Sequence, residues 1–208
     1  HLLIGEVWLC AGQSNMVMPL NGFDYCPISD SNNVIADAPN HPGIRMVTIK
    51  PTVKLSPQEY AEGSWQQPTT ENAPKFSAAA YHYALTLQRT LQIPIGVITC
   101  AWGGSRVEGW LPKEILQTYK DEDLTLIGSD KTPVYLQSML MYNGILYPCH
   151  KYTIKGFIWY QGESNVRSSR TYAERLATMV KHWRSIWKQG DLPFYYVETV
   201  PFACEYKE

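Results

Sequence analysis

The chain has 208 residues, of which 45% are hydrophobic, so it is long enough to bury one substantial core and we expect a single domain. Its 18 basic and 19 acidic residues are spread without long runs and give a formal net charge of -1. This balance excludes the charge pattern of a nucleic-acid-binding protein or of a protein that binds an anionic membrane, and it favours a small or neutral partner.

Five short apolar runs predict buried β-strands. In chain order they cover residues 4–10, 44–49, 95–100, 154–160 and 194–200. Helical patterns lie between them. Because strands that alternate with helices are joined by right-handed crossovers, this order predicts an α/β domain, built as a three-layer sandwich with a central parallel sheet.

Three stretches between the strands carry apolar residues at helical spacing. Ser77 is predicted to cap a helix that runs to about Leu91. The second predicted helix covers residues 136–146, and the third covers residues 171–187 and is closed by Gly190.

Two long segments, residues 19–42 and 51–74, are rich in Pro, Asn, Asp and Ser and are predicted to be loops. Either of them can shape a substrate pocket. We find no internal repeat, and no stretch of the sequence is long and apolar enough to span a bilayer.

The five cysteines show neither CxxC spacing nor a histidine grouping that binds zinc, so we expect no metal and no cofactor. Their number is odd, and Cys10 and Cys100 lie in apolar, strand-like runs. These features favour buried free thiols, with disulfide bonds as the open alternative.

Three of the predicted strands run into unusual polar sequences. Residues 11–16 follow the first strand, residues 101–105 the third and residues 161–165 the fourth. Because ligand sites in such sheets lie at the carboxyl ends of the strands, we expect these three segments to converge there. The sequence therefore predicts a functional site at this edge of the sheet.

Ser14 is the candidate nucleophile. It follows shortly after Gly12 at the end of a strand, where a tight turn can expose its hydroxyl group. The alternative is that Ser14 caps the following helix. The segment from Gly12 to Met16 lacks the second glycine of a GxSxG elbow, so the assignment depends on the other two strand ends.

The other two strand ends supply candidate partners. Gly103 and Gly104 let the backbone approach a ligand closely, so that one of their N–H groups can donate to the oxyanion of a tetrahedral intermediate; a plain turn is the alternative. Asn165 can add a side-chain donor to this oxyanion, or it can cap the third helix. Gln161 and Glu163 are candidates for contacting substrate or orienting a histidine, while a structural hydrogen bond is the alternative for Glu163.

Together these motifs resemble the SGNH (GDSL-like) hydrolases, and in particular the sialate O-acetylesterase and carbohydrate acetylesterase group. The resemblance extends over nearly the whole chain. It is carried by residues 5–16, by residues 102–105 with Glu108 and Trp110, and by residues 159–165. Three motifs in this order are far more specific than any one of them.

The resemblance implies the flavodoxin-like fold of the SGNH hydrolases and an esterase that removes acetyl groups from sialic acid or from a plant glycan such as xylan. It implies Ser14 as the nucleophile, Gly103 as the oxyanion glycine with Gly104 as the near alternative, and Asn165 as the oxyanion asparagine. It also implies an acetylated carbohydrate as the partner, no nucleic acid or membrane, and an extracellular or periplasmic location.

The family also carries a late Asp-x-x-His block that supplies the general base and its orienting carboxylate, and no segment of this chain matches it. A serine hydroxyl is a poor nucleophile until a base takes its proton. We therefore expect residues 1–208 to form an incomplete SGNH hydrolase domain, truncated at its C-terminus, with the catalytic His and Asp beyond residue 208. The alternatives are a non-catalytic carbohydrate-binding domain and an esterase or lipase of other acyl specificity.

Overall fold

The computed structural model describes residues 2–200, which contain a five-stranded parallel sheet. The strands are β1 (Glu6–Gly12), β2 (Ile44–Thr48), β3 (Ile95–Ala101), β4 (Gly156–Tyr160) and β5 (Phe194–Tyr196). Their order in the sheet is β2-β3-β1-β4-β5, so β1 is central. All five predicted strands are confirmed, although β5 ends at Tyr196, earlier than predicted.

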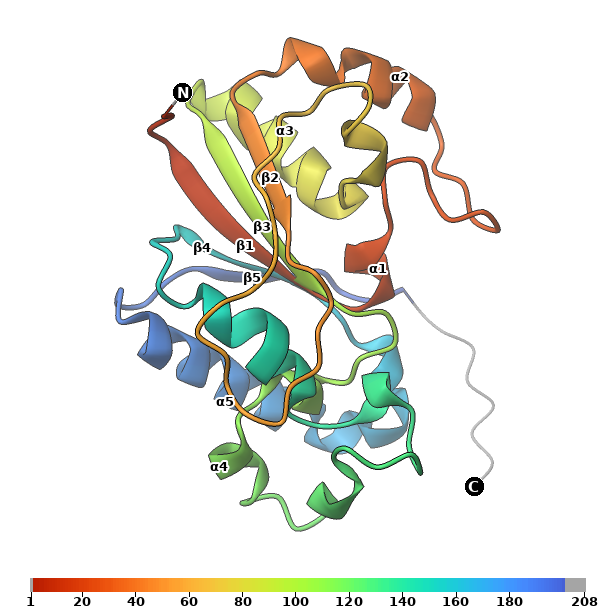
Figure 1. Ribbon diagram of the computed structural model, residues 1–208, viewed down its shortest axis with the longest axis vertical. Helices are drawn as coiled ribbons and strands as arrows, with labels where there is room; N and C mark the ends of the chain where they lie inside the picture. Colours follow the sequence, from red (N-terminus) through yellow and green to blue (C-terminus); the bar gives the residue numbers. More distant parts are fainter. Residues whose placement is uncertain (1, 201–208) are drawn as a thin grey trace.

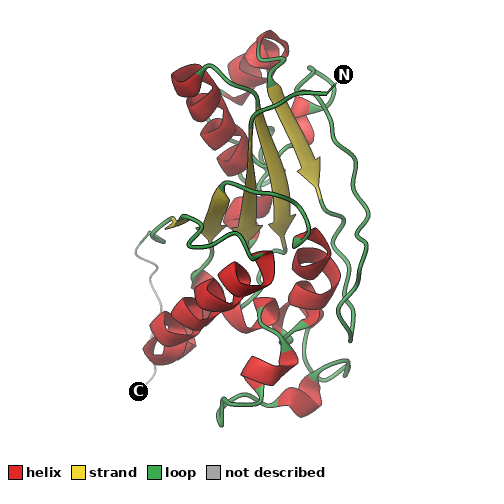
Figure 2. Ribbon diagram, turned by 90° about the vertical axis from the view of Figure 1, so that its left-hand side faces the viewer, coloured by secondary structure: helices red, strands yellow, loops and turns green. Residues whose placement is uncertain are grey.

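Helices cover both faces of this sheet (Figures 1 and 2). They are α1 (Ser14–Val17), α2 (Ser31–Asp37), α3 (Ala78–Leu91), α4 (Lys113–Leu116) and α5 (Ser169–Trp187). Helices α2 and α3 lie on one side and α5 on the other (Figure 1). The predicted three-layer α/β sandwich is therefore confirmed. No helix within residues 2–200 combines the length and the apolar character that crossing a bilayer requires.

Two of the three predicted helices are confirmed. Ser77 is the N-cap of α3, where its Oγ accepts a hydrogen bond from the Ala80 N–H, as predicted. Helix α5 begins at Ser169, slightly before the predicted start. It is closed by Lys188, which takes the left-handed conformation at φ 54°, so the assignment of Gly190 as the closing residue was wrong.

The helix predicted over residues 136–146 is wrong in its first part. Leu136 ends a 3₁₀ turn, and Met139 takes a positive φ of 71° that a continuous helix does not allow. Its N–H donates to the Glu108 carbonyl oxygen instead, at 3.0 Å. Helical turns begin at Leu140 and continue as a π-helix over Tyr142–Leu146.

Of the two predicted loops, one contains a helix and the other is a loop. Residues 19–42 contain α2 and a 3₁₀ turn, because Val34 and Ile35 pack against the core and stabilise a helix that the polar composition concealed. Residues 51–74 hold only an isolated bridge, at Gln66, and the start of a 3₁₀ turn, so the loop prediction is confirmed there.

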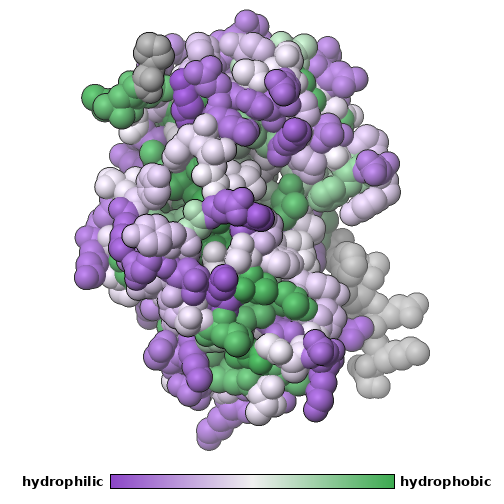
Figure 3. All heavy atoms as spheres, in the orientation of Figure 1, coloured by the Kyte–Doolittle hydropathy of each residue, from purple (hydrophilic) through white to green (hydrophobic). Residues whose placement is uncertain are grey.

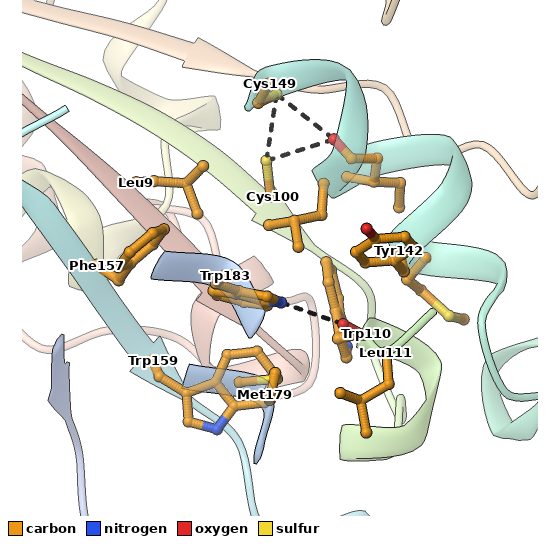
Figure 4. Packing of buried hydrophobic residues seen from close by; sticks show 14 of the residues in the cluster. Leu9, Cys100, Trp110, Leu111, Tyr142, Cys149, Phe157, Trp159, Met179 and Trp183 are labelled. Carbon is orange, nitrogen blue, oxygen red and sulfur yellow. Dashed lines mark hydrogen bonds between the residues drawn. The ribbon is translucent and has the colours of Figure 1, made fainter. Parts of the chain in front are cut away.

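Two hydrophobic clusters fill the space between the sheet and its helices. In β1, Leu9 and Ala11 face the α5 side, whereas Trp8 and Cys10 face the α3 side, which is the alternation expected of a strand covered on both faces. Figure 4 shows the α5-side cluster, in which Trp183 donates to the Trp110 carbonyl oxygen at 3.2 Å.

The cysteine prediction is also confirmed for the residues named. Cys10 and Cys100 are fully buried free thiols. Burial raises the pKa of Cys10 far above its ordinary value. The Sγ atoms of Cys100 and Cys149 lie 3.9 Å apart, within reach of a weak hydrogen bond between the thiols, and they form no disulfide (Figure 4).

Candidate active site

The carboxyl ends of three neighbouring strands meet, as the sequence predicts. Gly12 at the end of β1 pairs with Ala101 of β3 and with Tyr160 of β4. Beyond the strands, Gln13 N donates to the Tyr160 carbonyl oxygen and Trp102 N donates to the Gly12 carbonyl oxygen, each at 3.0 Å. The three polar segments are therefore held side by side by the backbone itself.

The turn before Ser14 requires its glycine. Gly12 has a φ of 148°, and a Cβ at this position would lie 2.1 Å from the Tyr160 carbonyl oxygen. Gln13 is buried beside it, and its Oε1 accepts hydrogen bonds from the N–H groups of Gly162 and Ser164, each at 3.3 Å. Ser14 is thereby fixed, half-buried, as the first residue of α1.

Gly103 lies against Ser14. A Cβ built on Gly103 would stand 4.0 Å from the Cβ of Ser14, with no other neighbour so near, and Gly103 is exposed. Within residues 2–200, neither the Ser14 N–H nor the Gly103 N–H donates to a backbone acceptor. Two N–H groups at this strand edge thus remain available to an oxygen atom bound beside the Ser14 hydroxyl.

Gly104, the alternative oxyanion glycine, is constrained differently. Its φ is 75°, and a Cβ there would lie 2.8 Å from Cδ2 of Tyr135. The absence of a side chain at Gly104 is therefore what lets the Tyr135 ring pack directly on the backbone.

Glu163 is linked to the residue that follows the nucleophile, because Asn15 Nδ2 donates a hydrogen bond to Glu163 Oε1 at 2.6 Å. The second carboxylate oxygen, Oε2, is buried and has no hydrogen-bond partner within the described part of the chain. A buried carboxylate oxygen without a donor is costly, so this atom calls for a partner that the described residues do not supply. Within residues 2–200, neither carboxylate oxygen accepts a hydrogen bond from a backbone N–H, which was the alternative role for Glu163.

Asn165 is only 2% exposed, and both ends of its amide have partners inside the protein. Its Oδ1 accepts from the Val107 N–H at 2.9 Å and from Gln161 Nε2 at 2.8 Å. Its Nδ2 donates to both carboxylate oxygens of Glu108, at 3.2 and 3.0 Å. The oxyanion role of Asn165 stays a prediction, and in this structure the amide joins the third polar segment to Val107 and Glu108, just after the second.

Gln161 has a similar joining position. Its Nε2 donates to the Ser105 carbonyl oxygen at 3.0 Å as well as to Asn165, and its Oε1 accepts from the Tyr172 hydroxyl at 2.9 Å. Burial raises the pKa of Tyr172 to about 12, so this hydroxyl keeps its proton and donates at neutral pH. Both polar atoms of the Gln161 amide therefore already have partners inside the protein, and a substrate would have to compete with them.

Glu108 is a part of the site that was not predicted from the sequence. It is completely buried, and Arg175 of α5 donates to its carboxylate. Burial by itself would lower the pKa of Arg175, but its hydrogen bond to Glu108 and the negative charges of Glu108, Asp121 and Glu122 outweigh burial and raise the pKa. The signal in the sequence was a carboxylate within the apolar run Val107–Trp110, because a buried charge needs a partner.

The described histidines lie away from this site. His41 contacts Asp37 and Gln88, His150 contacts the Tyr147 carbonyl oxygen, His182 contacts the Tyr142 hydroxyl, and His82 is exposed on α3. Among residues 2–200, no histidine forms a hydrogen bond with Ser14 or Glu163. The same residues contain no group of three or more His, Cys, Asp and Glu side chains arranged to hold a metal ion.

Comparisons with known proteins agree on one family. A family model described as "carbohydrate esterase, sialic acid-specific acetylesterase" matches residues 4–208. Sialate O-acetylesterases from Homo sapiens and Pongo abelii are each 28% identical over 198 residues, which cover 91% of this chain and 37% of each relative. The chain thus spans well under half the length of the curated relatives that it matches.

Solved structures show the same likeness. A carbohydrate acetylesterase from Xanthomonas citri is 31% identical, with a TM-score of 0.77 over 92% of this chain and 40% of that chain. A protein from Arabidopsis thaliana, 17% identical and covering 91% of this chain and 72% of its own, shares the fold with a TM-score of 0.55.

Proposed function

Because the chain belongs to the carbohydrate esterase family of sialic acid-specific acetylesterases, we propose that the protein of which it is a part is a serine esterase that removes O-acetyl groups from carbohydrates. The observation that carries this proposal is the position of Ser14 beside Gly103, at an edge where two backbone N–H groups lack backbone acceptors. The substrate is an acetylated sugar, either a sialic acid or a plant glycan such as xylan.

In the proposed reaction, Ser14 Oγ attacks the carbonyl carbon of the acetyl ester while a general base takes the hydroxyl proton. The tetrahedral intermediate carries its negative charge on the former carbonyl oxygen, which accepts from the N–H groups of Ser14 and Gly103. Its collapse breaks the ester bond, and the sugar oxygen leaves with the proton from the base. Water then hydrolyses the acetyl-enzyme, releasing acetate and restoring Ser14.

Glu163 has a part in this proposal as the carboxylate that orients the base, in place of the Asp that the late block of the family supplies for this role. Its Oε2, which has no hydrogen-bond partner among residues 2–200, is suited to accept the N–H of a histidine, while Asn15 holds Oε1. The histidine would come from the late Asp-x-x-His block of the family. Asn165 is the remaining predicted donor to the oxyanion, and to serve in this way its Nδ2 must be shared with Glu108.

The test is an acetate-release assay of the full-length protein on acetylated sialic acid and acetylated xylan side by side. We expect hydrolysis of at least one of them, and a Ser14→Ala variant that loses about a thousandfold or more of the activity. A Ser56→Ala variant, at an exposed loop serine, is the matched control. Full activity of Ser14→Ala would refute the proposal, and faster hydrolysis of longer acyl esters than of acetyl esters would favour an esterase of other acyl specificity.

A further inference from the structure

One aromatic side chain lies beside the site and takes no part in the proposed chemistry. Tyr135 packs on Gly104, with Cδ2, Cε2 and Cγ of its ring 2.8, 3.1 and 3.4 Å from the position that a Gly104 Cβ would take. Gly104 is the neighbour of Gly103, which in turn lies against Ser14. The Tyr135 ring therefore packs on the same turn that places Gly103 beside Ser14.

The loop that presents this ring is fixed at both ends. Gln137 is buried and closes the loop, because its Nε2 donates to the carbonyl oxygens of Ser129 and Thr132 and its Oε1 accepts from the Gly128 N–H. Arg106, which follows the Gly103–Gly104 turn closely in sequence, donates from Nε to the Leu136 carbonyl oxygen at 3.0 Å. Tyr135 is thus held beside the site before any ligand binds.

The ring is nevertheless 41% exposed. The preceding residue, Val134, is also exposed, as are the apolar side chains of Val53 and Leu55. These residues also line a depression of about 240 Å³ whose rim includes Lys54 and Asp130. Figure 3 shows hydrophobic residues gathered on the lower half of this face.

We propose that Tyr135 is a substrate-binding residue, whose ring supports the pyranose ring of the sugar while its acetyl group lies at Ser14. This inference rests on the proposed function. A pyranose ring has an apolar face of C–H groups, and sites for small molecules are lined by aromatic side chains with polar groups at a few positions. The ring of Tyr135 supplies the apolar surface, and the depression lined by its neighbour Val134 includes the charged side chains of Lys54 and Asp130.

Binding and hydrolysis test the proposal separately in the full-length protein. In a Ser14→Ala background, acetylated xylobiose and O-acetylated sialic acid are titrated by calorimetry. We expect the additional change Tyr135→Ala to weaken binding of the sugar that the enzyme hydrolyses by about tenfold, and Tyr135→Phe to retain it, because only the ring is required. Tyr60→Ala, at a residue that is 90% exposed, is the control and is expected to bind as the parent does.

With Ser14 intact, the same substitutions are assayed on ethyl acetate, an ester that has no ring. We expect Tyr135→Ala to raise the KM for the acetylated sugar about tenfold while leaving kcat/KM for ethyl acetate within about twofold of the parent. Unchanged sugar binding in Tyr135→Ala, or equal losses on both substrates, would overturn the proposal. Hydrolysis of ethyl acetate by the unsubstituted protein tests the proposed esterase function separately.

Discussion

Asn15 donates a hydrogen bond to Glu163 at 2.6 Å, although 148 positions separate the two residues in sequence. The contact joins the turn that carries Ser14 to the segment that follows β4. It occupies one carboxylate oxygen of Glu163 and leaves the other buried without a donor among the described residues. This asymmetry is what gives Glu163 a place in the proposed mechanism.

We expect the change Glu163→Gln to lower kcat by about ten-thousandfold with little change in KM. An amide in place of the carboxylate can present an N–H where an acceptor is needed, and it cannot stabilise an imidazolium. Steady-state kinetics of the full-length protein on its acetylated sugar measures this. Glu174→Gln, at an exposed position of α5, is the control. A Glu163→Gln enzyme with the parent's kcat would show that the carboxylate has only a structural role.

Alanine substitutions at two glycines with nearly equal φ can distinguish the cost of backbone strain from the cost of a steric clash. Gly104 and Gly190 have φ of 75° and 79°, but a Cβ at Gly190 would meet nothing within 4 Å. We expect Gly190→Ala to lower the free energy of unfolding by about 1–2 kcal/mol through strain alone. Gly104→Ala should cost about 1–3 kcal/mol more, because its Cβ collides with Tyr135.

Urea unfolding measures these differences, and a double variant identifies their cause. Adding Tyr135→Ala to Gly104→Ala should recover most of the excess loss, since the colliding ring is gone. If Gly104→Ala and Gly190→Ala lose equal free energies of unfolding, the Tyr135 ring can move aside without an energetic cost.

Asn165→Ala distinguishes the two roles of this amide. The contacts with Glu108 and Gln161 predict a loss of about 1–3 kcal/mol in the free energy of unfolding, because buried polar groups lose their partners. An oxyanion donor would instead lower kcat by about a hundredfold to a thousandfold. Thermal unfolding and kcat are measured together, with Asn33→Ala at an exposed position as the control. Unchanged stability with a large fall in kcat would contradict the structural role.

His182 makes the stability depend on pH. Burial lowers its pKa, while the charge of Glu114 opposes this shift, and its Nε2 lies 2.8 Å from the Tyr142 hydroxyl. Because the folded state binds this proton less readily than the unfolded chain, the stabilising contribution is present above the unfolded pKa. It is lost as the pH falls from about 7.5 to about 5.

The measurement is the urea midpoint across this pH range. We expect the His182→Gln variant to lose less stability on acidification than the parent protein does, while the exposed substitution His82→Gln leaves the pH dependence as it is. An identical pH dependence in His182→Gln and the parent would rule out this origin.

The five strands, the capped helix after Ser77 and the meeting of three polar segments at one sheet edge could all be predicted from the sequence alone. These features follow from periodicity and chain order, which act over a few residues at a time. Apolar alternation selects a strand, a serine caps the helix beside it, and parallel crossovers bring the carboxyl ends of the strands together.

Which atoms those polar residues contact depends instead on how the whole chain packs. Nothing local to Asn165 indicates that its amide lies on the carboxylate of Glu108, or that Met139 gives up a helical conformation to reach the Glu108 backbone. Nor does the sequence near Tyr135 place its ring on Gly104. A hydrogen bond or a ring contact is decided within about 3–4 Å, and packing of the whole chain sets which distant groups come that close.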